Sequence, residues 1–228
     1  MVVVLTTIDS CKKENQATTN VCPATVTDID GNVYNTLKIG NQCWMQQNLK
    51  TTHYRDGSEI TEIEDSSSWA NAQTQAWCYY NGDAASNTSY GKLYNWYAVT
   101  DPSQLCPAGW HVPSDTEWHT LALTLDSTAT WFNGVESAFA GGEMKAITLW
   151  LPQNTDATNS SGFTALPAGD RYNNGGFPAL GSYSGFWSST QVISTSSAWS
   201  RGLNYWSGSL YRGSDEDVLG HSVRCVGD

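Results

Sequence analysis

Short apolar runs separated by turn-forming residues begin after residue 22 and continue to the end of the chain. Between residues 25 and 45, the apolar positions lie on either side of Asp-Gly-Asn and Ile-Gly-Asn, which are hairpin turn signals. This pattern predicts a β-hairpin. The stretch 28–32 (Asp-Ile-Asp-Gly-Asn) begins like a calcium-binding loop. It lacks the later acidic ligands and the bidentate glutamate of such loops, so a turn is predicted there.

The middle of the chain favours helices. Residues 51–90 are mostly irregular, with one helical turn over 67–73, and the aromatic spacing of 90–99 suits a helix packed on the core. The clearest helix follows Pro113, because Ser114 and Glu117 have the spacing of a capping box. His111 and His119 lack a matching set of carboxylates, so surface or structural roles are expected for both rather than metal binding.

The second half predicts one more helix and several strands. Residues 134–145 suggest a short helix, and a Gly-rich region follows. Residues 196–213 suggest two strands joined at Ser-Gly-Ser, because Trp199, Arg201, Leu203 and Tyr205 alternate with small and polar residues. A last strand is expected within 221–228. The predicted class is α+β, with short helices, small antiparallel sheets and long irregular loops.

The amino-acid composition argues against some classes of function and favours others. The chain of 228 residues holds 11 Trp and 11 Tyr, has a formal net charge of −11, and only 14% of its residues are charged. Its few basic residues form no stripe, which argues against nucleic acid, and the acidic balance disfavours anionic membranes. Most of the tryptophans are expected in the core, but so many Tyr and Trp also favour a binding surface.

The N-terminal segment and the cysteines suggest the compartment. Residues 1–21 are predicted to be a flexible tail, and 22–228 one domain. The tail fits either a lipoprotein-signal remnant with Cys11 as the lipidated residue, or a disordered segment holding an accidental cysteine. No apolar run approaches the length of about 20 residues needed to span a membrane. The six cysteines include no Cys-x-x-Cys pair, so zinc-ribbon and thioredoxin-type chemistry find no support.

Three stretches together resemble the Fibrobacter succinogenes major paralogous domain. They are residues 25–57, residues 90–121 with "LCPAGWHVPSDTEW", and the ordered motifs "GFTALPAG", "GFWSST" and "HSVRCV". The resemblance covers about residues 22–227. It implies a C-type-lectin-like fold related to the formylglycine-generating enzymes. The family's members are mainly secreted or lipid-anchored proteins of Bacteroidetes-like bacteria and their phages.

The resemblance also implies how the cysteines pair. The cysteines of "LCP" and "VRC" correspond to Cys106 and Cys225, which are therefore expected to form a disulfide. Cys22 and Cys43 flank the predicted hairpin and are the next candidate pair, which would leave Cys78 free.

Family members also resemble the variable proteins of diversity-generating retroelements, in which a C-terminal segment changes while the scaffold is kept. Trp199, Arg201, Arg212, Arg224 and Cys225 fit the family's framework. Ten positions depart from its expected Tyr or Asn, which either diversification or ordinary drift explains. They are Ser200, Gly202, Leu210, Gly213, Ser214, Asp215, Asp217, Val218, Leu219 and His221.

The predicted function is ligand binding through this C-terminal surface, with a protein or a cell-surface glycan as the ligand. Asn204, Tyr205, Trp206 and Tyr211 complete the set of predicted contact positions, and Arg212 is a further candidate anchor. One alternative is a carbohydrate-binding lipoprotein or adhesin without diversification, with calcium held by "RGSDEDV" or "NGDAASN". The sugar-binding signatures of true C-type lectins are absent.

Catalysis is not expected. The formylglycine-generating relatives need two reactive cysteines near a groove, and here Cys106 and Cys225 are better explained as a structural bridge. No Ser-His-Asp, paired-carboxylate or His-Glu-x-x-His arrangement is apparent. No cofactor is predicted, and the expected location is the cell surface, the medium or a phage virion.

Overall fold

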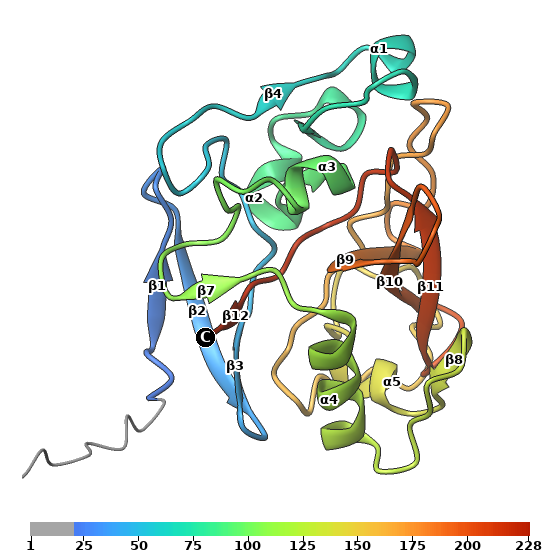
Figure 1. The fold of residues 1–228 in the computed structure, drawn as a ribbon. Coiled ribbons are helices and arrows are strands. Elements are labelled where there is room, and N and C mark those ends of the chain that lie inside the picture. The colour runs from blue at the N-terminus through green and yellow to red at the C-terminus, as the bar shows by residue number, and fades with distance from the viewer. Residues whose placement is uncertain (1–20) are drawn as a thin grey trace, which may run out of the picture.

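The computed structural model describes residues 21–228, which fold into small sheets and short helices joined by long loops (Figure 1). The predicted class is confirmed: the protein is mixed α+β, and its sheets are mainly antiparallel. The predicted N-terminal tail, apart from Val21, and the predicted lipidation of Cys11 lie outside the described residues. Within the described part, no helix is long and apolar enough to cross a membrane.

A five-stranded sheet holds both ends of the described chain. Its order is β1 (Thr25–Thr27), β2 (Val33–Ile39), β3 (Gln42–Met45), β12 (Val226–Gly227) and β7 (Trp110–His111). The predicted hairpin is present, and β3 extends it to a three-stranded meander. The predicted turn at 28–32 is also confirmed. The Asp28 carboxylate accepts hydrogen bonds from the backbone N–H groups of Asp30 (3.0 Å) and Asn32 (2.9 Å).

A four-stranded sheet lies on the opposite side of the molecule (Figure 1). Its order is β8 (Gly134–Ser137), β11 (Leu210–Glu216), β10 (Ser197–Asn204) and β9 (Tyr183–Gln191). A third, small sheet contains β4 (Thr61–Glu62), β5 (Ala76–Cys78) and β6 (Leu93–Tyr94). The pair β4 and β5 is parallel, which the prediction of antiparallel sheets did not anticipate.

The helices are short. They are α1 (Ser66–Ala70), α2 (Ser86–Tyr90), α3 (Trp96–Val99), α4 (Asp115–Leu125) and α5 (Ala140–Met144), with a 3₁₀ turn at Tyr80–Gly82. Helix α4 begins at the predicted capping box. Ser114 accepts from the N–H of Glu117, and the Glu117 carboxylate accepts from the N–H of Ser114 (2.8 Å).

Two predicted helices are partly wrong. The segment 90–99 becomes β6 and then the single turn α3, because Tyr94 pairs with Trp77 and bridges His221. The segment 134–145 becomes β8 and α5, because its first half pairs with β11. The last predicted strand is short, and within 221–228 only β12 forms regular pairing beyond isolated bridges. Long-range pairing outweighs local helix preference in both corrected segments.

An aromatic cluster joins the two larger sheets. The ring centroids of Trp44 and Trp118 are 4.8 Å apart, and those of Trp118 and Phe186 are 5.7 Å apart. Phe163 packs against all three of these rings. Because Trp44 comes from β3, Trp118 from α4 and Phe186 from β9, this cluster fixes the position of the four-stranded sheet.

Buried cations hold the loops in place. Arg224 is fully buried and donates to the backbone carbonyls of Phe163 and Thr164 (2.9 Å to the latter). Arg171 is also fully buried and donates to the carbonyls of Ile63 and Glu64 (2.6 Å to the latter). Buried backbone carbonyls without partners are costly, so these side chains replace the hydrogen bonds that regular structure would supply.

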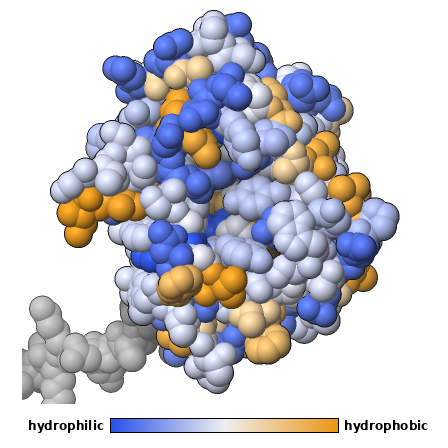
Figure 2. All heavy atoms as spheres, turned by 90° about the vertical axis from the view of Figure 1, so that its right-hand side faces the viewer, coloured by the Kyte–Doolittle hydropathy of each residue, from blue (hydrophilic) through white to orange (hydrophobic). Residues whose placement is uncertain are grey.

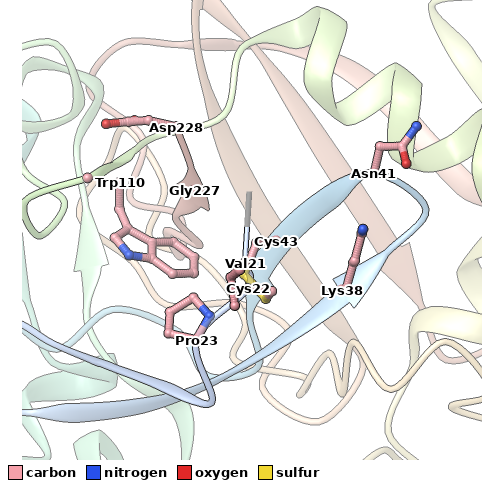
Figure 3. Close-up of a pocket in the computed structure, with 10 residues that line it drawn as sticks. Val21, Cys22, Pro23, Lys38, Asn41, Cys43, Trp110, Gly227 and Asp228 are labelled. Atoms are coloured by element: carbon pink, nitrogen blue, oxygen red, sulfur yellow. A yellow bond between two sulfur atoms is a disulfide. The ribbon is translucent and has the colours of Figure 1, made fainter. Parts of the chain in front are cut away.

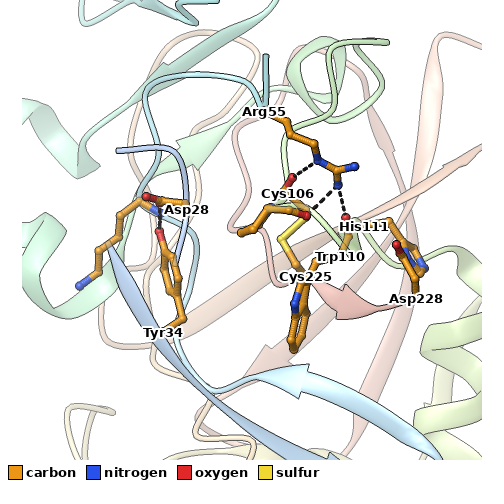
Figure 4. Close-up of a disulfide and its surroundings, with 10 residues drawn as sticks. Asp28, Tyr34, Arg55, Cys106, Trp110, His111, Cys225 and Asp228 are labelled. Atoms are coloured by element: carbon orange, nitrogen blue, oxygen red, sulfur yellow. Dashed lines mark hydrogen bonds and ion pairs between the residues drawn. A yellow bond between two sulfur atoms is a disulfide. The ribbon is translucent and has the colours of Figure 1, made fainter. Parts of the chain in front are cut away.

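Both expected disulfides are present. Cys106 is bonded to Cys225, and Cys22 to Cys43, while Cys78 is a buried free thiol. Figure 4 shows the Cys106–Cys225 bridge beside Arg55, whose guanidinium donates to the carbonyls of Cys106 (3.0 Å) and Pro107 (2.7 Å). The C-terminal segment is therefore tied covalently to the loop before β7.

Candidate ligand-binding cleft

The segment predicted to bind a ligand forms the β10–β11 hairpin and the connection from β11 to His221. Ser197 pairs with Glu216, Gly202 pairs with Tyr211, and β9 pairs with the other side of β10. The two predicted strands and their turn are confirmed. The alternation along β10 does not separate a buried face from an exposed one, because Ser200 and Gly202 are buried as well as Arg201 and Leu203.

Two buried arginines lie side by side across this hairpin. Arg201 pairs with Arg212, and like charges in directly opposite positions repel. Asp115, at the N-terminus of α4, bonds both guanidinium groups, at 2.8 Å to Arg201 and 2.6 Å to Arg212. Burial raises the pKa of Asp115, but the two arginines outweigh it and hold the pKa below its usual value. Glu136 of β8 pairs with Arg201, so the hairpin is fixed to α4 and β8 by charge.

Lys145 holds the turn of the hairpin. Its side chain is fully buried, and Nζ donates to the carbonyls of Thr155 (2.8 Å), Asn204 (3.0 Å) and Ser207 (2.8 Å). Burial lowers the pKa of Lys145 to about 8. The end of β10 and the turn after it are therefore attached to the loop that follows α5.

A cleft of about 460 Å³ lies beside this hairpin. Figure 2 views the molecule from the side that carries β8, β10 and β11, where the surface is mostly hydrophilic and is hollowed near its middle. The cleft is lined by Asp170, Tyr172, Ala179, Ser182, Tyr183, Asn204, Trp206, Asp215, Leu219 and His221. An adjoining hollow shares Tyr172, Asp215 and Leu219 and extends to Ser214.

Two paired glycines lie beneath the cleft. Gly185 of β9 is the partner of Gly202 of β10. A Cβ atom at Gly202 would lie 2.8 Å from the Tyr183 hydroxyl oxygen, and one at Gly185 would lie 2.4 Å from Nδ1 of His221. The sheet thus lacks side chains where these two rings cover it, which lets both rings lie close to the backbone.

Asp170 is a buried carboxylate on the wall of the cleft. Its residue is 5% exposed, and among the described residues Oδ1 has no hydrogen-bond partner. Burial raises the pKa of Asp170 to about 6, and the charge of Asp215 adds to this effect while His221 opposes it. An ionised carboxylate in this position is only partly compensated by its surroundings.

Asp215 is a better compensated carboxylate. Oδ2 accepts from the Ser200 hydroxyl and lies 3.1 Å from Nε2 of His221. Burial raises the pKa of Asp215, but the hydrogen bond and charge of His221, together with Ser200, lower it overall. The cleft therefore holds two carboxylates in different environments.

The structure separates the predicted contact positions into three groups. Asn204, Trp206, Asp215, Leu219 and His221 line the cleft. Outside the cleft, Ser214 is exposed to solvent. Four more of these positions are partly exposed: Tyr205, Tyr211, Gly213 and Val218. A third group lies outside the cleft and is buried: Ser200, Leu210 and Asp217, together with Gly202, which lies under Tyr183. His221 is also fully buried, although it lines the cleft. Leu210 packs in the core, and the candidate anchor Arg212 is bound to Asp115.

Sequence reasoning missed half of the cleft. Asp170, Tyr172, Ala179, Ser182 and Tyr183 come from the Gly-rich region, where no hydrophobic period marks them. Isolated bridges join this region to β9 and to the connection after β11: Gly169 pairs with Ser184, and Arg171 pairs with Gly220. A charged residue and two tyrosines between glycines were the available signal in the sequence.

The remaining candidate groups have structural partners. Burial raises the pKa of the Cys78 thiol to about 12, which keeps it protonated and unreactive. His111 lies 2.7 Å from Glu117 and 2.6 Å from Asp228, and His119 lies 2.7 Å from Glu136, so both histidines have the structural contacts expected of them. Across residues 21–228, no three His, Cys, Asp or Glu side chains are grouped to hold a metal ion.

Another hollow, of about 170 Å³, lies at the five-stranded sheet (Figure 3). The Cys22–Cys43 disulfide, Pro23, Trp110 and Lys38 line it, and none of the predicted contact positions does. Val21, the first described residue, is also at its edge.

The model of the Fibrobacter succinogenes major domain matches residues 37–227. The chain belongs to this family. The match includes Cys106, Cys225 and the whole of the four-stranded sheet, so the cleft lies within the Fibrobacter succinogenes major domain. Comparison with curated proteins and with solved structures found no match.

Proposed function

We propose that this chain is a ligand-binding protein, in which a C-type-lectin-like scaffold presents the surface of β10, β11 and the following loop to a protein or a cell-surface glycan. The observation that carries the proposal is the cleft between the Gly-rich region and the hairpin. Trp206 is 55% exposed and Tyr172 is 46% exposed at this cleft, and large aromatic side chains are common at the centres of binding surfaces.

The fixed surroundings of the hairpin support this proposal. Asp115, Glu136 and Lys145 hold the strands and the turn from below, so the cleft does not depend on contacts made by its exposed residues. A binding site on rigid strands loses little conformational freedom when a ligand binds. The same arrangement would tolerate exchange of exposed residues in the segment.

Diversification by a retroelement is part of the proposal. It would act on exposed positions such as Trp206 and Ser214, whereas a polar replacement of the fully buried Leu210 would disturb the core. A reverse transcriptase gene and a near-repeat of the 3′ end of this gene in the neighbouring DNA would support it. Neighbouring DNA without either would leave a binding protein or adhesin of fixed sequence.

We also propose a binding role rather than a catalytic one, at the cell surface or outside the cell. Four cysteines are in disulfides, and such bonds persist in oxidising compartments. The free Cys78 is buried with a raised pKa, so the described residues offer no pair of reactive thiols like that of the formylglycine-generating enzymes.

The test is a screen of bacterial surface proteins and glycans arrayed on slides. The wild-type protein is compared with Trp206→Ala and with Phe132→Ala, a matched loss of an exposed aromatic that does not line the cleft. The proposal predicts ligands that are lost with Trp206→Ala and kept with Phe132→Ala. Ligands that bind both variants equally would place recognition elsewhere on the molecule.

A further inference from the structure

We propose that the cleft binds an organic cation, namely the ammonium or guanidinium group of a lysine or arginine side chain on a protein ligand. This inference rests on the binding function proposed above and narrows its ligand to a basic segment of a protein. It follows from the carboxylates, the aromatic rings and the cations that surround the cleft.

The position of Asp170 is fixed on both sides. The N–H of Gly169 donates to the carbonyl of Tyr183 (2.9 Å), and Arg171 exchanges two backbone hydrogen bonds with Gly220 (2.9 and 2.8 Å). The backbone that carries Asp170 is therefore fixed at the wall of the cleft. Its buried Oδ1 has no partner within residues 21–228, so the site holds a preformed acceptor for a hydrogen-bond donor.

The cation next to Asp170 in sequence does not neutralise it. The Arg171 guanidinium donates to the carbonyls of Ile63 and Glu64, and it stacks on Trp69 at 4.4 Å. Lysine and arginine are absent from the residues that line the cleft. His221 lines it, but its Nε2 is engaged by Asp215 and its Nδ1 faces Gly185.

Aromatic rings complete the site. Tyr172, Tyr183 and Trp206 line the same cleft as the two carboxylates. The faces of such rings attract ammonium and guanidinium groups, most strongly where water is partly excluded. The same protein already uses this contact, because Arg212 lies 3.3 Å from the ring centroid of Trp199.

The charge argues against the other ligand classes. Two carboxylates in a chain of net charge −11 repel phosphate, sulfate and sialic acid groups. A neutral sugar could donate a hydroxyl hydrogen bond to Asp170, but it would leave the charge of that carboxylate uncompensated. A cationic group satisfies both the hydrogen bond and the charge.

The test is calorimetric titration at neutral pH and low ionic strength with blocked amino acids. Nα-acetyl-lysine methylamide and Nα-acetyl-arginine methylamide are compared with their neutral counterparts, the Nε-acetylated lysine and the citrulline derivatives. Butylamine separates a small free amine from a peptide-borne one, and methyl glucoside reports a neutral sugar. The inference predicts that the cationic amino acids bind at least about tenfold more tightly than their neutral counterparts and methyl glucoside, the ratio expected for one charge-assisted hydrogen bond. They should also bind more tightly than butylamine, which carries the charge but none of the peptide.

Three variants test whether the cations bind at the cleft. Asp170→Asn and Asp215→Asn each remove one negative charge from it, and Glu59→Gln removes one from an exposed site outside it. Asp170→Asn should weaken cation binding about tenfold or more without lowering the unfolding temperature, whereas a purely structural carboxylate would lower that temperature. Glu59→Gln should bind as the wild type does. Asp215 bonds Ser200 and His221, so Asp215→Asn could unfold. In that case, the affinity of Asp170→Asn for the cations decides the test.

Several results would overturn the inference: no binding of the cations, equal binding of cations and neutral counterparts, tighter binding of butylamine or methyl glucoside, or unchanged affinity in Asp170→Asn. The proposed function fails separately. An arrayed ligand that is lost with Trp206→Ala but binds Asp170→Asn fully leaves the binding function in place and refutes the cationic ligand.

Discussion

Gly202 of β10 is paired with Gly185 of β9, and the rings of Tyr183 and His221 cover this glycine pair. The two rings differ in their burial. Tyr183 lines the cleft and meets a Cβ at Gly202 through the far end of its side chain, whereas the His221 ring is fully buried and packs at 4.4 Å from Trp187. This difference gives a stability prediction.

Gly185→Ala should destabilise the protein more than Gly202→Ala. The first change forces a buried ring to shift, at a cost of about 2 kcal/mol in the range known for overpacked cores. The second displaces only Tyr183, and about 0.5 kcal/mol is expected because alanine also suits a strand better than glycine does. Urea unfolding measures both values. An equal or larger loss in Gly202→Ala would show that the Tyr183 ring is not free to move.

Asp115→Asn should be among the most destabilising polar changes in the molecule. It removes the charge between Arg201 and Arg212, both of which are buried. A loss of about 3–5 kcal/mol is expected, because an uncompensated buried charge remains. Asp83→Asn, an exposed residue between the 3₁₀ turn and α2, is the matched control and should change stability little. A loss under 1 kcal/mol in Asp115→Asn, by the same measurement, would mean that the arginines find other partners.

The charge on Asp170 should cost stability at neutral pH. Its folded pKa is about 6 and its ordinary value is 3.8, so the folded protein favours the protonated acid. The stabilisation that this preference gives is fully present below pH 3.8 and is lost as the pH rises through 6. The charges of Asp215 and His221 also act on this carboxyl group, the first raising its pKa and the second lowering it.

Asp170→Asn should therefore be more stable than the wild type at pH 7, by up to about 3 kcal/mol, the energy that corresponds to this pKa difference. The gain should shrink towards acid pH, where the wild-type carboxyl is already neutral. Unfolding free energies of both proteins across the acid and neutral range provide the measurement. A variant that is less stable than the wild type at pH 7 would assign Asp170 a structural role.

The two disulfides should contribute different amounts to the free energy of unfolding. Cys106–Cys225 joins residues 119 apart and Cys22–Cys43 joins residues 21 apart. In the chain-entropy account, removal of the longer link costs about 5 kcal/mol and removal of the shorter link about 3 kcal/mol. Paired Cys→Ala variants, compared by denaturant unfolding, test this order. Greater loss from the Cys22 and Cys43 pair would indicate that the β1 connection matters more than the C-terminal one.

Local signals in the sequence were enough for part of the fold. The capping box of Ser114 and Glu117 marked α4, and the glycine turns marked the meander of β1 to β3. Family resemblance gave the Cys106–Cys225 bridge. In each case the deciding residues lie close in sequence or follow a known motif.

Contacts between segments distant in the sequence determine the remaining parts of the fold and the cleft. Residues 134–137 look helical, but in the fold Val135 pairs with Tyr211, and Glu136 meets Arg201. Asp170 reaches the cleft only because its neighbours bridge residues 184 and 220. Likewise, its departure from the family's expected Tyr or Asn placed Leu210 among the contact positions, while its side chain is fully buried. No local pattern in a single sequence carries these pairings.

The most direct test of the central claim is a hydrogen-exchange footprint of a ligand found in the array screen, bound to the intact protein. The account predicts slower exchange at residues 170–172, 182–183 and 204–206 around the cleft, with little change in α4 and β2. Slower exchange confined to α4, β2 or the hollow at Trp110, with the cleft segments unchanged, would contradict it.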